Sequence, residues 1–137
     1  MHQHSSPQQR NKEIVRRFNT DFIGQGDITA FNEIVDPAVI NHTALPGMSK
    51  GADGMMGLIL LFRKALPDLS VEIADQIAED DLVVTRKYFH ATFTSEIMGI
   101  PPSGKKIRIP VIDIIRLRNG KYIEHWGIRD MSQLLQK

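Results

Sequence analysis

The chain has 137 residues, 42% of them hydrophobic, and a formal net charge of +1 at pH 7. It contains no cysteine, which excludes disulfides, thiolate nucleophiles and cysteine-ligated zinc. The near-neutral charge argues against a nucleic-acid partner, and the longest apolar stretch, residues 55–62, is too short to span a bilayer. We therefore expect a cytoplasmic protein with neither a nucleic-acid nor a membrane partner.

The N-terminal part of the chain has the apolar spacing of a helix. Residues 1–10 are polar and lack the apolar segment of a secretory signal, so we expect them to form a disordered tail. In residues 11–26, apolar residues recur at intervals of four, which is typical of an amphipathic helix. One domain is predicted to span residues 11–137.

Two further helices are predicted before the strands begin. Asp27 is a suitable N-cap for a short second helix, which is expected to end at Asp36-Pro37. A third helix is predicted from Ala52 to Leu66. Pro67 closes it, because proline has no amide hydrogen to continue the helical bonding.

From residue 69 onward, apolar residues alternate with polar ones, as in β-strands. The predicted strands are residues 69–79, residues 81–96 and the two halves of residues 105–128, which are joined at Asn119-Gly120. Three helices followed by hairpin-connected strands predict an α+β fold, with the helices packed on a strongly curved antiparallel sheet. The concave side of such a cone-shaped barrel is expected to enclose an internal pocket.

The turn of the last hairpin decides which side chains face each other. If Asn119-Gly120 is a two-residue loop, Asp113 lies opposite Trp126. If the loop includes Arg118, it has three residues, and Asp113 lies opposite His125. We favour the three-residue loop, because it alone places an acid directly across from a histidine, where the two can form a hydrogen bond.

His125 and Asp113 are the candidate catalytic residues. A carboxylate beside the imidazole would favour its protonated form and fix its tautomer, whereas burial would lower its pKa. The sequence leaves open whether this pair performs acid–base chemistry or is a satisfied polar pair inside the sheet. A carboxylate among apolar strand residues needs some partner in either case.

Other polar residues are candidates for substrate binding. Asn41 and His42 follow a short strand and are expected at the rim of the pocket, although a loop or capping role also fits. Asp130 precedes a short apolar segment, so it is either an N-cap of a final helix or a pocket residue.

One strand carries three further candidates. Arg86, Tyr88 and His90 share a face of the strand predicted at residues 81–96, and the sequence does not say whether this face is the inner one.

No metal site is predicted. His42, His125 and one acid would match a facial triad in composition, but no compact metal-binding motif supports the grouping.

Several stretches resemble the SnoaL-like polyketide cyclase family of the nuclear-transport-factor-2-like superfamily. They are residues 39–47, 50–55, 62–73, 97–107, 112–126 and 130–136. The resemblance implies an α+β cone and a reaction without metal or cofactor. In that reaction, a carboxylate takes a proton from an aromatic polyketide ester, and an intramolecular aldol addition closes a ring.

The resemblance also implies a departure at the site. The catalytic aspartate of the family falls on Gly127, and a pocket histidine of the family falls on Asp113. We expect Asp113 and His125 to carry acid–base work in exchanged roles on a small hydrophobic carbonyl compound. The alternatives are a non-catalytic binding module of the same fold and a dimerising domain with a filled cone.

The other face of the last hairpin is expected to mediate assembly. It would expose Ile112, Ile114, Tyr122 and Trp126, an apolar patch that a soluble monomer rarely leaves uncovered. A homodimer or a higher homo-oligomer is therefore expected.

Overall fold

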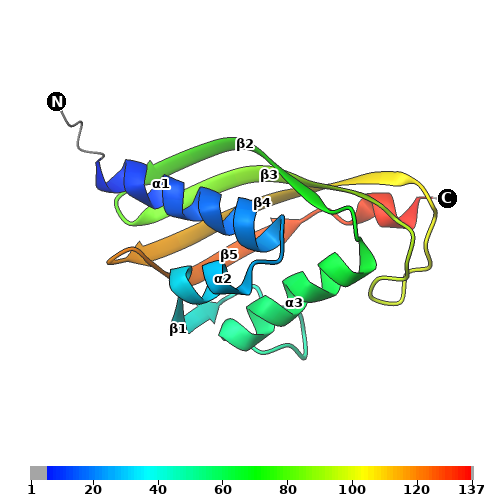
Figure 1. Cartoon of the computed structure of the whole chain (residues 1–137), viewed down its shortest axis with the longest axis horizontal. Helices are drawn as coiled ribbons and strands as arrows, with labels where there is room; N and C mark the ends of the chain where they lie inside the picture. Colours follow the sequence, from blue (N-terminus) through cyan, green and yellow to red (C-terminus); the bar gives the residue numbers. More distant parts are fainter. Residues whose placement is uncertain (1–5, 137) are drawn as a thin grey trace.

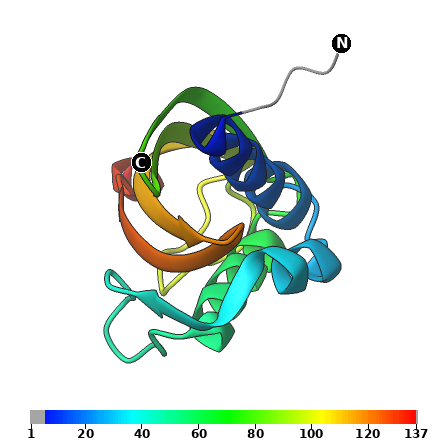
Figure 2. The ribbon, with the colours of Figure 1, turned by 90° about the vertical axis from the view of Figure 1, so that its left-hand side faces the viewer.

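The computed structural model describes residues 6–136. Three helices, α1 (Pro7–Arg17), α2 (Ile28–Ile34) and α3 (Ala52–Ala65), pack against a curved sheet (Figure 1). Figure 2 shows the sheet curling into an open cone whose free side is covered by the helices. The predicted α+β class is confirmed.

The first helix begins earlier than predicted. Ser6 caps α1 by accepting a hydrogen bond from the backbone of Gln9 at 3.1 Å, and Pro7 occupies the first turn, where no amide hydrogen is needed. The expected tail of residues 1–10 therefore extends too far, because residues 7–10 are helical, while residues 1–5 lie outside the described part of the chain. After α1 the helix widens into a π-helical turn at Phe18–Ile23.

The sheet has five strands in the order β1-β5-β4-β3-β2. Their bounds are β1 Val35–Asn41, β2 Ser70–Glu79, β3 Leu82–Thr92, β4 Lys106–Arg118 and β5 Lys121–Arg129. Strands β2 to β5 form an antiparallel meander, as predicted. The sheet as a whole is mixed, because β1 lies parallel to β5. An antiparallel sheet throughout was predicted, but β1 reaches the edge of β5 through a long connection rather than a hairpin.

The turn between β4 and β5 differs from the favoured prediction. Asn119 and Gly120 both have positive φ, 52° and 75°, and they form a two-residue turn that pairs Arg118 with Lys121. The register then shifts, so that Tyr122 and Glu124 lie opposite the adjacent residues of β4. The shift is a β-bulge that leaves one extra residue in β5.

Beyond the bulge, Asp113 lies opposite Gly127 and His125 lies opposite Ile115. The predicted pairing of Asp113 with His125 is therefore wrong, although both side chains still share the concave face. Tyr122 lies before the bulge and points inward, with 2% of its surface exposed, so its predicted place in the outer patch is also wrong.

The core fills most of the cone. Aromatic rings from the π-helical turn, α2 and β5 cluster at its centre, with ring centroids 4.7 to 6.1 Å apart: Phe18, Phe22, Phe31 and Tyr122. Such spacing is favourable for tilted aromatic pairs. The cone is thus largely filled, with an inner cavity left between this cluster, α3 and strands β3, β4 and β5.

Candidate functional site

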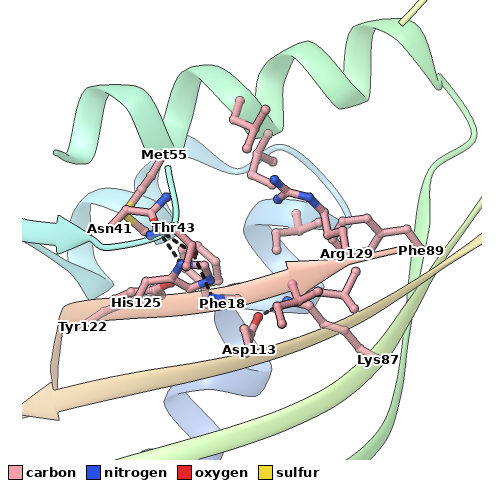
Figure 3. A pocket seen from close by; sticks show the side chains of 16 residues that line it. Phe18, Asn41, Thr43, Met55, Lys87, Phe89, Asp113, Tyr122, His125 and Arg129 are labelled. Atoms are coloured by element: carbon pink, nitrogen blue, oxygen red, sulfur yellow. Dashed lines mark hydrogen bonds and ion pairs between the residues drawn. The ribbon is translucent and has the colours of Figure 1, made fainter. Parts of the chain in front are cut away.

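An inner cavity of about 60 Å³ lies on the concave face of the sheet, beneath α3. Its apolar lining consists of Phe18, Ile23, Met55, Leu58, Ile59, Phe89, Val111, Gly127 and Ile128. Its polar lining consists of Asn41, Thr43, Lys87, Asp113, Tyr122, His125 and Arg129 (Figure 3). The cavity is small, so as it stands it suits a compact molecule rather than a multi-ring one.

The orientation of His125 is fixed by the end of β1. Its Nδ1 lies 2.8 Å from Oδ1 of Asn41, and the backbone N–H of Thr43 donates to the same oxygen at 3.1 Å. A backbone N–H only donates, so the Asn41 atom that receives it is the oxygen. Nδ1 of His125 must therefore carry the hydrogen, and Nε2 keeps its lone pair.

His125 is neutral over the physiological range. Burial in the cone lowers the pKa of its imidazole to about 4, which the nearby Asp113 carboxylate only partly offsets. The cations Lys87 and Arg129 lower this pKa further. The result is an unprotonated nitrogen, Nε2, in a largely apolar cavity.

Gly127 makes room for this ring. A Cβ at that position would lie 2.9 Å from Cε1 and 3.0 Å from Nε2 of His125, and 3.3 Å from Cβ of Asp113. The imidazole thus extends over Gly127 toward Asp113. An aspartate at position 127, which the family resemblance led us to consider, is incompatible with this placement of the ring.

Asp113 binds a lysine instead of the histidine. Oδ2 of Asp113 lies 2.7 Å from Nζ of Lys87, and both side chains are almost completely buried. Lys87 also donates to Oδ1 of Asn19 at 2.6 Å, and Asn19 is in turn fixed by donating to the carbonyl of Val15 at 2.9 Å. The carboxylate therefore has the buried partner that the sequence required, but a different one from that predicted.

One oxygen of this carboxylate is left over. Oδ1 of Asp113 is buried and has no hydrogen-bond partner within residues 6–136. A buried acceptor without a donor is energetically costly. We therefore expect Oδ1 to accept a hydrogen bond from a bound molecule.

Arg129 is the second cation of the cavity. It projects inward from the end of β5 toward α3 (Figure 3), and its guanidinium lies over the ring of Phe62, 5.5 Å from the centroid. Partial burial lowers its pKa. No carboxylate or carbonyl in the described part of the chain accepts a hydrogen bond from it.

Sequence reasoning missed Lys87 and Arg129. The alternation of inward and outward side chains along a strand could have indicated both. Lys87 lies between apolar inward positions of β3, and Arg129 lies two residues after Gly127 on the inner face of β5. The buried side chains of β3 are Val83, Thr85, Lys87, Phe89 and Ala91.

His42 lies outside the cavity. It stacks on Trp126, with ring centroids 4.8 Å apart, and its Nε2 lies 2.8 Å from Oε2 of Glu124. Glu124 also accepts from Arg116 at 2.9 Å. His42 therefore belongs to a surface network and is separated from His125 by the sheet, so these two histidines do not form the facial triad that was considered.

The remaining predicted binding residues also face outward. Arg86 pairs with Asp75 at 2.6 Å and donates to the hydroxyl of Tyr88 at 2.9 Å. His90 lies 2.7 Å from a carboxylate oxygen of Glu72. Of the predicted binding residues, only Asn41 lines the inner cavity.

Asp130 does not hold the N-cap position, which was one of its two predicted roles. The N-cap of the final 3-10 helix, Ser132–Leu135, is Met131, which makes no side-chain capping bond. Asp130 instead accepts a hydrogen bond from the backbone N–H of Ser132 through Oδ1 at 2.9 Å. It also lines an outer groove of about 450 Å³ on the convex face. The groove is formed by Thr43, Arg86, Lys87, Tyr88, Pro110, Val111, Ile112, Ile114, Trp126, Gly127, Ile128 and Asp130.

Within residues 6–136, no three side chains of histidine, aspartate or glutamate come together as a metal site would require. Nor does any helix there have the length and apolar character needed to cross a membrane.

The sequence profile of the SnoaL-like polyketide cyclase family matches residues 13–137. A comparison with curated proteins gives no match.

Solved structures have the same fold. IdmH from Streptomyces antibioticus, a proposed polyketide cyclase, is 26% identical with a TM-score of 0.81, covering 91% of this chain and 95% of its own. AclR from Streptomyces galilaeus, a proposed hydroxylase, is also 26% identical with a TM-score of 0.81, covering 93% and 94%. TsrD from Streptomyces laurentii is 25% identical with a TM-score of 0.83, covering 95% of each chain.

Proposed function

Because the chain belongs to the SnoaL-like polyketide cyclase family, we propose that it is a cofactor-independent acid–base enzyme. Its substrate is a small hydrophobic carbonyl compound, and its reaction is an intramolecular aldol cyclisation or a related isomerisation. One observation carries the proposal: His125 is neutral, held in a single tautomer, and has a free Nε2 in the cavity.

In this reaction, Nε2 of His125 takes a proton from the carbon next to the substrate carbonyl. The carbon's electron pair moves into the enolate, which attacks a second carbonyl of the same molecule and forms the new bond. The imidazolium then returns its proton to the resulting alkoxide, so no co-reactant is needed. General base catalysis of this type typically contributes about 10²- to 10⁴-fold to the rate.

Asn41 and Asp113 support the base in different ways. Asn41 holds Nδ1–H, so the ring presents the correct nitrogen throughout the cycle. Asp113, which is paired with Lys87, favours the imidazolium that forms after proton transfer. Asp113 thus acts through its charge, and His125 takes the role that an aspartate has in the family.

The experiment is proton exchange in D₂O. The α-hydrogens of a small hydrophobic ketone such as acetophenone are followed by NMR with the wild-type protein and with His125→Gln. The substitution should lower the protein-dependent exchange rate by about 10²-fold or more. His90→Gln removes an outward-facing histidine and should leave the rate unchanged. Equal rates for all three proteins would refute the proposal.

A non-catalytic binding module of the same fold is the second candidate. Gly127 and the small volume of the cavity favour it, since the family's catalytic aspartate is absent. In that case the protein binds the ketone but does not accelerate exchange. Mass spectrometry of any ligand that co-purifies with the protein would then identify the natural occupant.

We also propose that two copies assemble through the convex face. Ile112 is 52% exposed and Ile128 is 78% exposed, and both lie in the apolar outer groove next to Trp126. Sedimentation should give a dimer or a larger homo-oligomer at micromolar concentration, and Ile128→Asp should shift it toward the monomer. A wild-type monomer would contradict this proposal.

We further propose that the protein is cytoplasmic and has no nucleic-acid partner.

A further inference from the structure

The charges that line the inner cavity do not balance. Lys87 and Arg129 are positive, Asp113 is negative, and the other lining side chains, including the neutral His125, carry no charge. Lys87 and Asp113 neutralise each other at 2.7 Å. One positive charge, that of Arg129, therefore remains in a partly buried site, where an unpaired charge is costly.

Arg129 also has unused hydrogen-bonding capacity. A guanidinium has five N–H donors in a planar fork that suits a carboxylate. Within the described residues, the guanidinium of Arg129 lies over the ring of Phe62 and is influenced by the charge of Asp113, but no oxygen accepts a hydrogen bond from it. The fork is thus available to a molecule that enters the cavity.

Asp113, on the same cavity wall, has an acceptor oxygen that lacks a hydrogen-bond donor. The residue is 3% exposed, and its Oδ1 lacks a donor within residues 6–136. Lys87 occupies the other oxygen, so the ion pair does not satisfy Oδ1. The cavity therefore offers one unpaired donor group and one unpaired acceptor, with an apolar wall between helix α3 and the sheet.

We propose that the inner cavity binds an apolar carboxylate that carries a hydroxyl group. Arg129 binds the carboxylate through its N–H fork, and the hydroxyl donates to Oδ1 of Asp113. Met55, Leu58 and Phe89 surround the apolar body. The inference rests on the proposed function for the assignment of this cavity as the reactive site, and it narrows the substrate class to hydroxylated acids.

Calorimetric binding of three probes tests the inference. The probes are 3-hydroxybenzoate, benzoate, which lacks the hydroxyl, and 3-hydroxybenzamide, which lacks the negative charge. The wild-type protein should bind 3-hydroxybenzoate about 3- to 10-fold more tightly than benzoate, and at least about 10-fold more tightly than the amide. Equal affinity for 3-hydroxybenzoate and the amide would overturn the anionic assignment, and equal affinity for the two acids would overturn the hydroxyl contact.

Variants of two arginines complete the test. Arg129→Gln should weaken 3-hydroxybenzoate binding by about 10-fold or more and leave amide binding unchanged. Arg108→Gln removes a cation from the convex face, where Arg108 lies over Tyr88, and should change neither affinity. If both variants weaken acid binding equally, attraction is unspecific and the inference is wrong.

The comparison with His125→Gln separates this inference from the proposed function. That variant should retain Arg129-dependent binding while losing proton exchange. If the wild-type protein binds the hydroxy acid through Arg129 but never accelerates exchange, the proposed function fails and the binding assignment stands. If proton exchange depends on His125 but binding of the hydroxy acid does not depend on Arg129, the proposed function stands and the binding assignment fails.

Discussion

The two faces of β4 and β5 contain similar residue types but satisfy them differently. On the convex face, Arg116 binds Asp81 and Glu124, and Glu124 binds His42, so the charges are paired with one another. On the concave face, the free groups are Nε2 of His125, Oδ1 of Asp113 and the fork of Arg129. The charges of the convex face are thus already satisfied by one another. The candidate site lies on the concave face, where polar groups lack hydrogen-bond partners.

The two histidines show the same contrast. His42 stacks on an indole and contacts a carboxylate at the surface. His125 contacts a neutral amide inside the cone, and its pKa is lowered to about 4. A carboxylate partner favours a charged ring, whereas an amide partner together with burial keeps the ring neutral. The inner histidine therefore stays unprotonated at neutral pH, and its Nε2 faces the cavity without a hydrogen-bond partner in the described residues.

The largest expected effect comes from breaking the inner ion pair. Lys87→Met leaves the buried Asp113 carboxylate uncompensated and should lower the free energy of unfolding by about 3–5 kcal/mol. Arg116→Met breaks outer pairs that are solvated and should cost far less stability. Urea unfolding measures both. Similar losses for the two variants would remove the energetic contrast between the faces.

A second effect is a loss of stability in mild acid. The pKa of His125 in the folded protein, about 4, lies below the ordinary histidine value of 6.5, so the unfolded chain binds more protons between these pH values. Stability should fall as pH drops from about 6.5 to about 4, by on the order of 3 kcal/mol.

Two variants isolate this contribution from that of the carboxylates. His125→Gln should flatten the stability curve between about pH 6.5 and pH 4, because the glutamine cannot titrate. His42→Gln should retain the drop, since His125 is still present. Thermal unfolding at several pH values provides the measurement. A wild-type curve that is already flat would contradict the buried, neutral assignment of His125.

A third effect compares two glycines. Gly127→Ala places a methyl group within 3.0 Å of the His125 ring and should destabilise the protein by about 1–3 kcal/mol. Gly57→Ala, in α3, has nothing within 4 Å of the new methyl and should stabilise the helix by up to about 1 kcal/mol. Denaturant midpoints distinguish the two. A neutral Gly127→Ala would mean that the ring moves freely.

The smallest expected effect is a shift in the pKa of His125. Asp113→Asn removes the carboxylate that favours the His125 imidazolium, so the pKa of His125 should move below its value of about 4. NMR titration of the ring protons measures the shift. His42→Gln, on the other face, is the matched comparison. An upward or absent shift in Asp113→Asn would show that the two groups do not interact.

The sequence predicted the correct face for the wrong reason. The three-residue turn and the observed two-residue turn with its bulge give registers that differ by two residues. A two-residue difference preserves alternation, so His125 and Asp113 face inward in both. Tyr122 lies between the turn and the bulge, where the alternation differs, and its placement was therefore wrong.

The hydrogen-bond and ion-pair partners of these side chains were harder to predict than the sheet face on which each side chain lies. Arg86, Tyr88 and His90 attracted attention because they form the more polar face of β3, yet Lys87 is the charged residue that the core encloses. Buried lysines are rare, and only the three-dimensional arrangement of Asn19 and Asp113 explains this one. Asn41 was identified as a rim residue, but its bond to His125 depends on the parallel pairing of β1 with β5.

That parallel pairing also determines when the site can exist. Asn41 and His125 are 84 residues apart, in the first and last strands. At typical synthesis rates of about 5–20 residues per second, the ribosome adds His125 roughly 4 to 17 s after Asn41. During that interval, α3 and strands β2 to β4 are added, but the nascent chain has no oriented imidazole. Synthesis of β5 is therefore a condition for any chemistry in the cavity.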